Sequence, residues 1–104
     1  MSVLLDFGMF PVDKGESVST YVSRLLSMID ARGVAYKVSP MGTVIETETL
    51  DEALAVVRDA YALLEPDCNR VYSTLKLDIR KGKSGRLVSK LESVEKKVGR
   101  KLKT

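Results

Sequence analysis

Five polar residues lie in stretches that we predict to be buried strands, where apolar residues would cost less free energy to bury. Thr43 and Glu46 lie at the start of one β-prone stretch. Asn69 and Arg70 open a second such stretch, and Asp6 interrupts a third. A buried polar group that lacks a hydrogen-bond partner costs about 1–3 kcal/mol. If neighbouring strands bring these groups together, they must therefore find partners there. Convergence indicates either an internal hydrogen-bond network or a pocket for a small polar ligand, and the spacing alone leaves both open.

The chain offers little to a catalytic mechanism. It has no histidine, which removes the usual general base near neutral pH and the commonest transition-metal ligand. Glu46 and Glu48 are two residues apart on a predicted strand and could share acid and base roles, but two solvent-facing glutamates at a strand end are far commoner. We therefore predict a protein that is not an enzyme and that uses no metal or cofactor.

A single cysteine, Cys68, excludes an intramolecular disulfide and is typical of a reducing compartment. A reactive thiol would need a basic neighbour, and the sequence displays none beside it. No stretch approaches the roughly 20 apolar residues of a membrane helix, and the N-terminus lacks a basic leader segment. The sequence predicts a soluble, cytoplasmic protein.

Glycine-rich phosphate-binding motifs are absent, although the segment Lys81-Gly-Lys-Ser-Gly-Arg86 is basic and flexible. Its amides and cations could contact an anion, but a mobile turn explains the same composition more simply. We therefore interpret this segment as a turn.

The predicted strands are apolar or alternating stretches over residues 3–10, 34–39, 43–48 and 69–80. Ser17 is the expected N-cap of a first helix, which Gly33 ends in the left-handed conformation. Thr49 and Glu52 form a capping box for a second helix. Large apolar residues then recur along this second helix at Leu50, Leu54, Val57, Tyr61 and Leu64.

A third helix is predicted from the spacing of Leu87, Leu91, Val94 and Val98, with Gly99 as its end. The order is β-α-β-β-α-β plus one helix, which is typical of a ferredoxin-like α+β fold with an antiparallel sheet covered by helices on one face. We expect one domain over residues 1–98 and a frayed basic tail over residues 99–104. The other sheet face, with Tyr72 and Thr74, is either exposed to solvent or an oligomer interface.

Charge is distributed unevenly along the chain. The net charge is +3, but residues 1–80 carry −4 and residues 81–104 carry +7. Nucleic-acid modules usually combine a basic face with aromatic residues for stacking, whereas this basic end has no aromatic residue. A solvated helix end explains the excess, so we predict no nucleic-acid partner.

Three motifs and the order in which they occur resemble those of the thiamine-binding, YkoF-like domain family. The motifs are Met9-Phe-Pro-Val-Asp-Lys-Gly-Glu-Ser17, Pro40-Met-Gly-Thr-Val-Ile-Glu46, and Cys68-Asn-Arg-Val-Tyr followed by Asp78-Ile-Arg80. The ending Leu91-Glu-Ser-Val-Glu-Lys-Lys97 is also similar. The resemblance implies a ferredoxin-like domain that forms dimers or tetramers. It further implies non-catalytic binding of thiamine, or of its hydroxymethylpyrimidine part, at or near subunit interfaces.

The resemblance also implies a set of ligand-binding residues, and their chemistry suits an aminopyrimidine. Such a ring offers acceptor nitrogens and an amino donor, so it requires both an oxygen acceptor and a hydroxyl or amide donor. The residues at the matched positions provide both kinds of group. They are Thr43, Glu46, Asn69 and Arg70, with Ser17 and Met41 as further lining residues.

A second hypothesis remains beside the binding protein. It is a structural or regulatory interaction module that oligomerises through its open sheet face and takes no small ligand. A stable oligomer that is indifferent to ligands and is disrupted by charge at Tyr72 or Thr74 would distinguish it.

Overall fold

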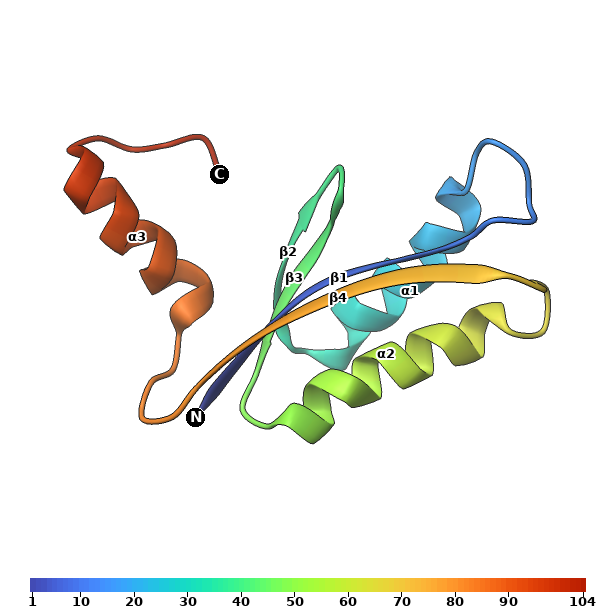
Figure 1. Cartoon of the computed structure of the whole chain (residues 1–104), viewed down its shortest axis with the longest axis horizontal. Coiled ribbons are helices and arrows are strands. Elements are labelled where there is room, and N and C mark those ends of the chain that lie inside the picture. The colour runs from blue at the N-terminus through green and yellow to red at the C-terminus, as the bar shows by residue number, and fades with distance from the viewer.

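A computed structural model describes residues 1–104 as four strands and three helices (Figure 1). Along the chain these are β1 (Ser2–Pro11), α1 (Ser19–Arg32), β2 (Ala35–Ser39), β3 (Gly42–Thr47), α2 (Leu50–Leu64), β4 (Val71–Arg80) and α3 (Arg86–Val98). The predicted ferredoxin-like α+β fold with an additional C-terminal helix is confirmed. None of the helices is both long enough and apolar enough to span a membrane.

The strands form one antiparallel sheet in the order β2-β3-β1-β4. β1 lies inside the sheet, between β3 and β4. β4 pairs with β1 along all ten of its residues, from Ser2 opposite Arg80 to Pro11 opposite Val71. β4 is therefore an edge strand whose outer side has no partner in the chain.

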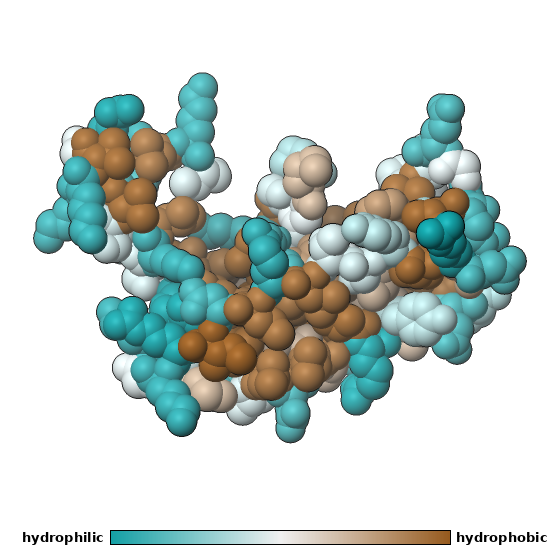
Figure 2. Space-filling model, viewed as in Figure 1, coloured by the Kyte–Doolittle hydropathy of each residue, from teal (hydrophilic) through white to brown (hydrophobic).

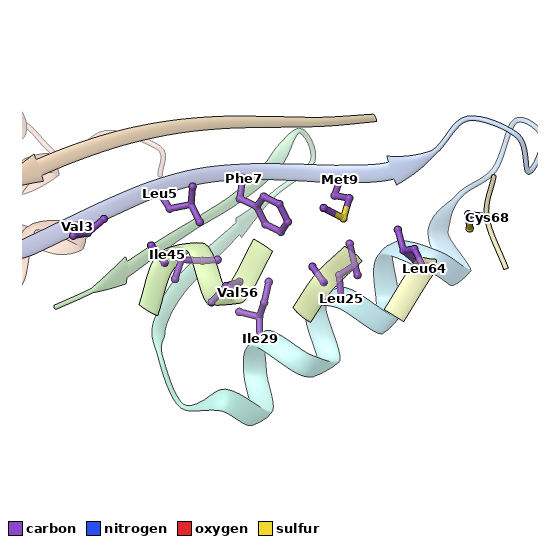
Figure 3. Close-up of a cluster of buried hydrophobic side chains, with 12 residues drawn as sticks. Val3, Leu5, Phe7, Met9, Leu25, Ile29, Ile45, Val56, Leu64 and Cys68 are labelled. Atoms are coloured by element: carbon purple, nitrogen blue, oxygen red, sulfur yellow. The ribbon is translucent and has the colours of Figure 1, made fainter. Parts of the chain in front are cut away.

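The hydrophobic core lies between the sheet and the helices α1 and α2. Side chains alternate across a strand, so every second residue of β1 points into the core. Figure 3 shows these β1 side chains above Leu25 and Ile29 of α1 and Val56 of α2. A fully buried aliphatic side chain contributes about 1.5–3 kcal/mol, so this layer holds the fold together. The β1 residues in it are Val3, Leu5, Phe7 and Met9.

Helix ends follow the predicted signals with one exception. Gly33 and Gly99 end α1 and α3 in the left-handed conformation, at φ 79° and 87°. The Thr49 side chain accepts a hydrogen bond from the Glu52 backbone amide at 3.2 Å, which is one of the two bonds of the predicted capping box. The prediction that Ser17 caps α1 is wrong, because the cap position is Val18 and the Ser17 hydroxyl instead meets that of Ser19 at 3.4 Å. The first turn of α1 thus begins one residue later than expected.

α3 lies on the face of the sheet opposite to α1 and α2 (Figure 1). Its first residue, Arg86, is 4% exposed and donates hydrogen bonds to the carbonyls of Ser2 and Asp78 at 3.0 and 2.6 Å. The expectation of a fully open second face is therefore corrected: α3 covers one end of it. The division into a domain and a frayed tail stays a prediction, although the Leu102 amide donates to Glu95 at 2.6 Å.

Candidate ligand-binding site

A mostly apolar cavity lies between α1, the central strands and the hairpin that joins β2 to β3. Its volume is about 290 Å³. The sheet contributes its floor, α1 one wall, and the hairpin the other wall. No charged side chain lines it. The lining residues include Phe7, Phe10, Val22, Leu26, Val38, Ser39, Met41 and Thr43.

Thr43 supplies a polar side chain to this cavity. It lies on β3 opposite Phe7 and is only 5% exposed. None of the side-chain hydrogen bonds in the chain uses its hydroxyl, and no fully buried polar atom lacks a partner. Because Thr43 lines the cavity and its hydroxyl is neither sealed nor bonded within the chain, the hydroxyl is available to a ligand there.

The hairpin that forms the outer wall is held in a defined shape. The Ser39 hydroxyl donates to the Gly42 carbonyl at 3.1 Å and accepts from the Met41 amide at 3.2 Å. A Cβ atom at Gly42 would lie 3.1 Å from the Phe7 carbonyl oxygen, so glycine permits the close approach of β3 to β1. Met41 is left 92% exposed at the tip, at the mouth of the cavity.

Glu46 lies on the other face of the sheet and is already engaged. Its carboxylate accepts hydrogen bonds from the amides of Arg86 and Leu87, at 2.9 and 3.1 Å, and from the Ser2 hydroxyl. These are the free amides at the start of α3, so Glu46 caps that helix from a strand. Burial alone would raise the pKa of the Glu46 carboxyl, but the bonds from Ser2 and the two amides outweigh it and hold the pKa below its usual value.

The loops before α1 and before β4 bring the remaining candidates to one end of the molecule. The backbone amide of Asn69 donates to the Asp13 carboxylate at 2.8 Å, and the backbone amide of Val12 donates to the Arg70 carbonyl at 2.9 Å. Asn69, Arg70 and Ser17 are exposed, and none of the three lines the cavity. Their backbones tie the loops together while the side chains of Asn69 and Arg70 stay in solvent.

The expectation that Thr43, Glu46 and Asn69 share one hollow is therefore wrong within a single chain. Thr43 and Glu46 are three residues apart on a strand, and residues an odd number apart point to opposite faces. Of the six predicted residues, the cavity gathers Thr43 and Met41. Phe7 and Phe10, which are among the few aromatic residues that the sequence offers for stacking on a ligand, also line it. Sequence reasoning missed the lining residues of α1, Val22 and Leu26, because their helical spacing predicts only core packing.

A family model described as thiamine-binding protein matches residues 5–95, which is most of the chain. The chain belongs to the thiamine-binding protein family. Family-level recognition from the three motifs is thus confirmed.

Relatives of this thiamine-binding family member are similar over most of their length. A UPF0045 protein of Methanothermobacter thermautotrophicus is 40% identical over 83 residues, covering 79% of this chain and 84% of the relative. A hypothetical protein of Methanocaldococcus jannaschii has a crystal structure that matches with a TM-score of 0.80 at 33% identity, over 89% of this chain and 95% of the other. A Thermotoga maritima structure, described provisionally as a thiamine biosynthesis or salvage protein, shares the fold with a TM-score of 0.73 at 24% identity, over 86% of this chain and 98% of the other.

This family member has a second and larger cleft, of about 490 Å³, between α3 and the sheet face that it partly covers. Lysine and aspartate side chains surround apolar residues there, including Leu4, Val44 and Leu91. None of the six predicted site residues lines it. The one signal for this cleft in the sequence is the apolar stripe of α3, which requires a surface to pack on.

Proposed function

We propose that this chain is a cytoplasmic, non-catalytic protein that binds thiamine or its hydroxymethylpyrimidine part and works as a homo-oligomer. The observation that carries the proposal is the free Thr43 hydroxyl in an apolar cavity of a chain that belongs to the thiamine-binding family. The description of the Thermotoga maritima relative supports the same ligand class.

The cavity suits the pyrimidine half of thiamine better than the cationic half. A flat aromatic ring can pack against Phe7, which lies opposite Thr43, while Thr43 bonds a ring nitrogen or the amino group. The volume of about 290 Å³ lies at the lower end of ligand pockets, which span roughly 300–1,000 Å³. The thiazolium ring would then extend past Met41 toward solvent or a neighbouring subunit.

The exposed loop residues Ser17, Asn69 and Arg70 fit a role that needs a second subunit. Their side chains lie outside the cavity of their own chain, so we propose that they contact ligand only across a subunit interface. Both carboxylate oxygens of Glu46 are engaged by the start of α3, and we leave Glu46 outside the proposed contacts.

Thermal shift measurements on Thr43→Val test the proposal. Valine keeps the shape of threonine and removes the hydroxyl, so stability should change little while the affinity for thiamine or hydroxymethylpyrimidine falls about three- to tenfold, the range of one hydrogen bond. The wild-type midpoint should rise with ligand because a ligand that binds only the native state stabilises it.

Thr74→Val is the matched control, since Thr74 is an exposed threonine of β4 that does not line the cavity. It should retain the full ligand shift. Wild-type protein freed of carried-over ligand that shows no shift with either compound at millimolar concentration would contradict the proposal. Equal loss of affinity in both variants would remove Thr43 from the site.

Exposed apolar residues on α2 and β4 favour one second candidate, an interaction module without a small ligand. It predicts an oligomer whose stability does not respond to either compound. The thermal shift of the wild type therefore separates the two functions.

A further inference from the structure

A polar hollow of about 380 Å³ lies where β4 ends and α3 begins. The chain turns between Arg80 and Arg86, and this turn brings the end of β4 beside the start of α3. Figure 2 shows hydrophilic side chains gathered over the turn that Figure 1 draws between these two elements. Of the eight residues that line the hollow, only Val94 is hydrophobic.

The periods of strand and helix place these polar side chains on facing surfaces. Asp78 and Arg80 are two residues apart on β4, so both point to the sheet face on which α3 lies. On α3 the polar residues follow one another at spacings of three, one and three, which form one face of a helix. They are Arg86, Ser89, Lys90 and Ser93. Lys83 of the turn completes the polar lining.

Cations outnumber carboxylates in this hollow by four to one. The cations are Arg80, Lys83, Arg86 and Lys90, and the carboxylate belongs to Asp78. The Asp78 Oδ2 atom lies 2.6 Å from the Lys90 ammonium and 3.0 Å from the Arg86 guanidinium, so its charge is already offset. Arg80 and Lys83 form no ion pair within the chain, and both are exposed. An anion in the hollow would therefore contact two unpaired cations.

Arg86 offers the hollow a hydrogen-bond donor from a buried position. The residue is 4% exposed, and a guanidinium carries five N–H groups. Three of them donate to the Ser2 hydroxyl and to the carbonyls of Ser2 and Asp78, at 3.1, 3.0 and 2.6 Å. The Nη1 atom carries the other two, and one of these can face the Asp78 carboxylate at 3.0 Å. The remaining N–H favours an acceptor in the hollow, because a buried donor without a partner costs free energy.

We propose that this hollow binds a phosphate dianion, either free or carried by a small polar ester. A phosphate group has several acceptor oxygens, and guanidinium and ammonium groups bind them through charge-assisted hydrogen bonds. Ser89 and Ser93 add hydroxyl donors to the lining. The volume of about 380 Å³ lies in the range of small-molecule pockets, roughly 300–1,000 Å³. The polar lining favours an ester whose body is also polar.

This site is separate from the cavity around Thr43. The cavity lies on the sheet face that α1 covers, whereas the hollow lies on the face where α3 packs, and the two share no lining residue. The inference therefore goes beyond the proposed function and does not depend on thiamine binding.

Isothermal titration calorimetry of the full chain tests the site. Inorganic phosphate and glycerol 2-phosphate serve as separate probes, at one ionic strength that is set with chloride, and should bind saturably with one site per chain. Lys83→Gln and Arg80→Gln should each weaken this binding about three- to fivefold, the range of one partly exposed ion pair.

Lys103→Gln is the matched control, because it removes the same charge from an exposed residue outside the hollow, in the tail that leaves the far end of α3 (Figure 1). It should weaken binding less than about twofold, since salt screens charges that lie more than about 8 Å apart. Amide NMR spectra of the wild type should show phosphate-dependent shifts in residues 83–86 and none at Thr43.

The outcomes separate a site from a general effect of charge. Equal weakening in Lys83→Gln and Lys103→Gln would overturn the proposal, and so would the absence of saturable binding of either probe at millimolar concentration. Binding of inorganic phosphate alone would identify the free anion as the ligand. Tighter binding of glycerol 2-phosphate would identify a small phosphate ester.

Discussion

Thr43 and Glu46 show how one strand supplies two unrelated surfaces. The hydroxyl of Thr43 opens into the cavity beside α1, and the carboxylate of Glu46 holds the start of α3 on the opposite face. Both residues could be singled out from the sequence as polar groups in an apolar stretch. Their roles could not be separated from the sequence, because the backbone amide that donates to Glu46 lies forty positions further along the chain and no local pattern predicts the contact.

Replacing Glu46 with glutamine should destabilise the fold by about 1–2 kcal/mol at pH 7, the range for loss of a helix cap. The folded pKa of Glu46 lies below the value of about 4.3 found in unfolded chains. The carboxylate therefore stabilises the fold fully above about pH 4.3, and this contribution is lost as the pH falls through the folded pKa. Denaturant unfolding at several pH values should show the difference from wild type shrinking below pH 4.

Glu48→Gln is the control for that experiment, as an exposed glutamate on the same segment. It should change stability by less than about 0.5 kcal/mol. A difference between wild type and Glu46→Gln that stays constant from pH 7 to pH 3 would contradict the capping role.

At the scale of elements, α2 shows that apolar periodicity predicts where a helix lies but not which of its residues are buried. Its bounds, Leu50–Leu64, and its N-cap Thr49 follow from the sequence. Of the predicted stripe of large apolar residues, however, only Leu64 is fully buried, and the other buried residues are Ala53, Val56 and Ala60. Small residues let the helix sit close to the sheet, and the larger ones beside them are left on the flank. Periodicity measures which residues share a face but not which neighbour that face meets.

α3 depends on Arg86 for its attachment to the sheet. Replacing Arg86 with methionine keeps the apolar stem but removes the bonds to the Ser2 and Asp78 carbonyls, which should loosen α3 by about 2–3 kcal/mol. Hydrogen exchange should then accelerate in the amides of α3 while those of β1 and β3 stay protected.

Lys83→Met is the matched control, since Lys83 is an exposed cation in the turn that leads to α3. It should leave the exchange of α3 unchanged. Unaltered protection of α3 in Arg86→Met would show that its apolar stripe alone holds the helix in place.

At the scale of the whole molecule, a four-stranded fold of this kind leaves its two sheet edges unlike each other. β2 is a short edge of five residues, whereas β4 is a long edge of ten with half-exposed apolar side chains. The strand order was implied by the β-α-β-β-α-β pattern, but exposure along β4 depends on how far α2 reaches across the sheet. That distance is set by packing and has no signature in the sequence.

Assembly as the proposed homo-oligomer should make thermal stability depend on protein concentration. The unfolding midpoint of the wild type should rise with concentration, because a dimer that binds only folded chains stabilises them by mass action. Leu77→Asp should lower the midpoint and abolish its dependence on concentration. Val88→Asp, at a 49% exposed position of α3, should keep that dependence, and a wild-type midpoint that is constant over a hundredfold dilution would argue against assembly.

Ser2 has a practical bearing on all of these measurements. It is 1% exposed, its hydroxyl bonds Glu46 and Arg86, and its carbonyl accepts from Arg86 as well. A purification tag fused directly ahead of Met1 would crowd the contacts of Ser2 with Glu46 and Arg86, which hold the start of α3. A tag after Thr104 would extend from an exposed residue. Recombinant protein should therefore be tagged after Thr104 or cleaved back to Met1 before stability or assembly is compared.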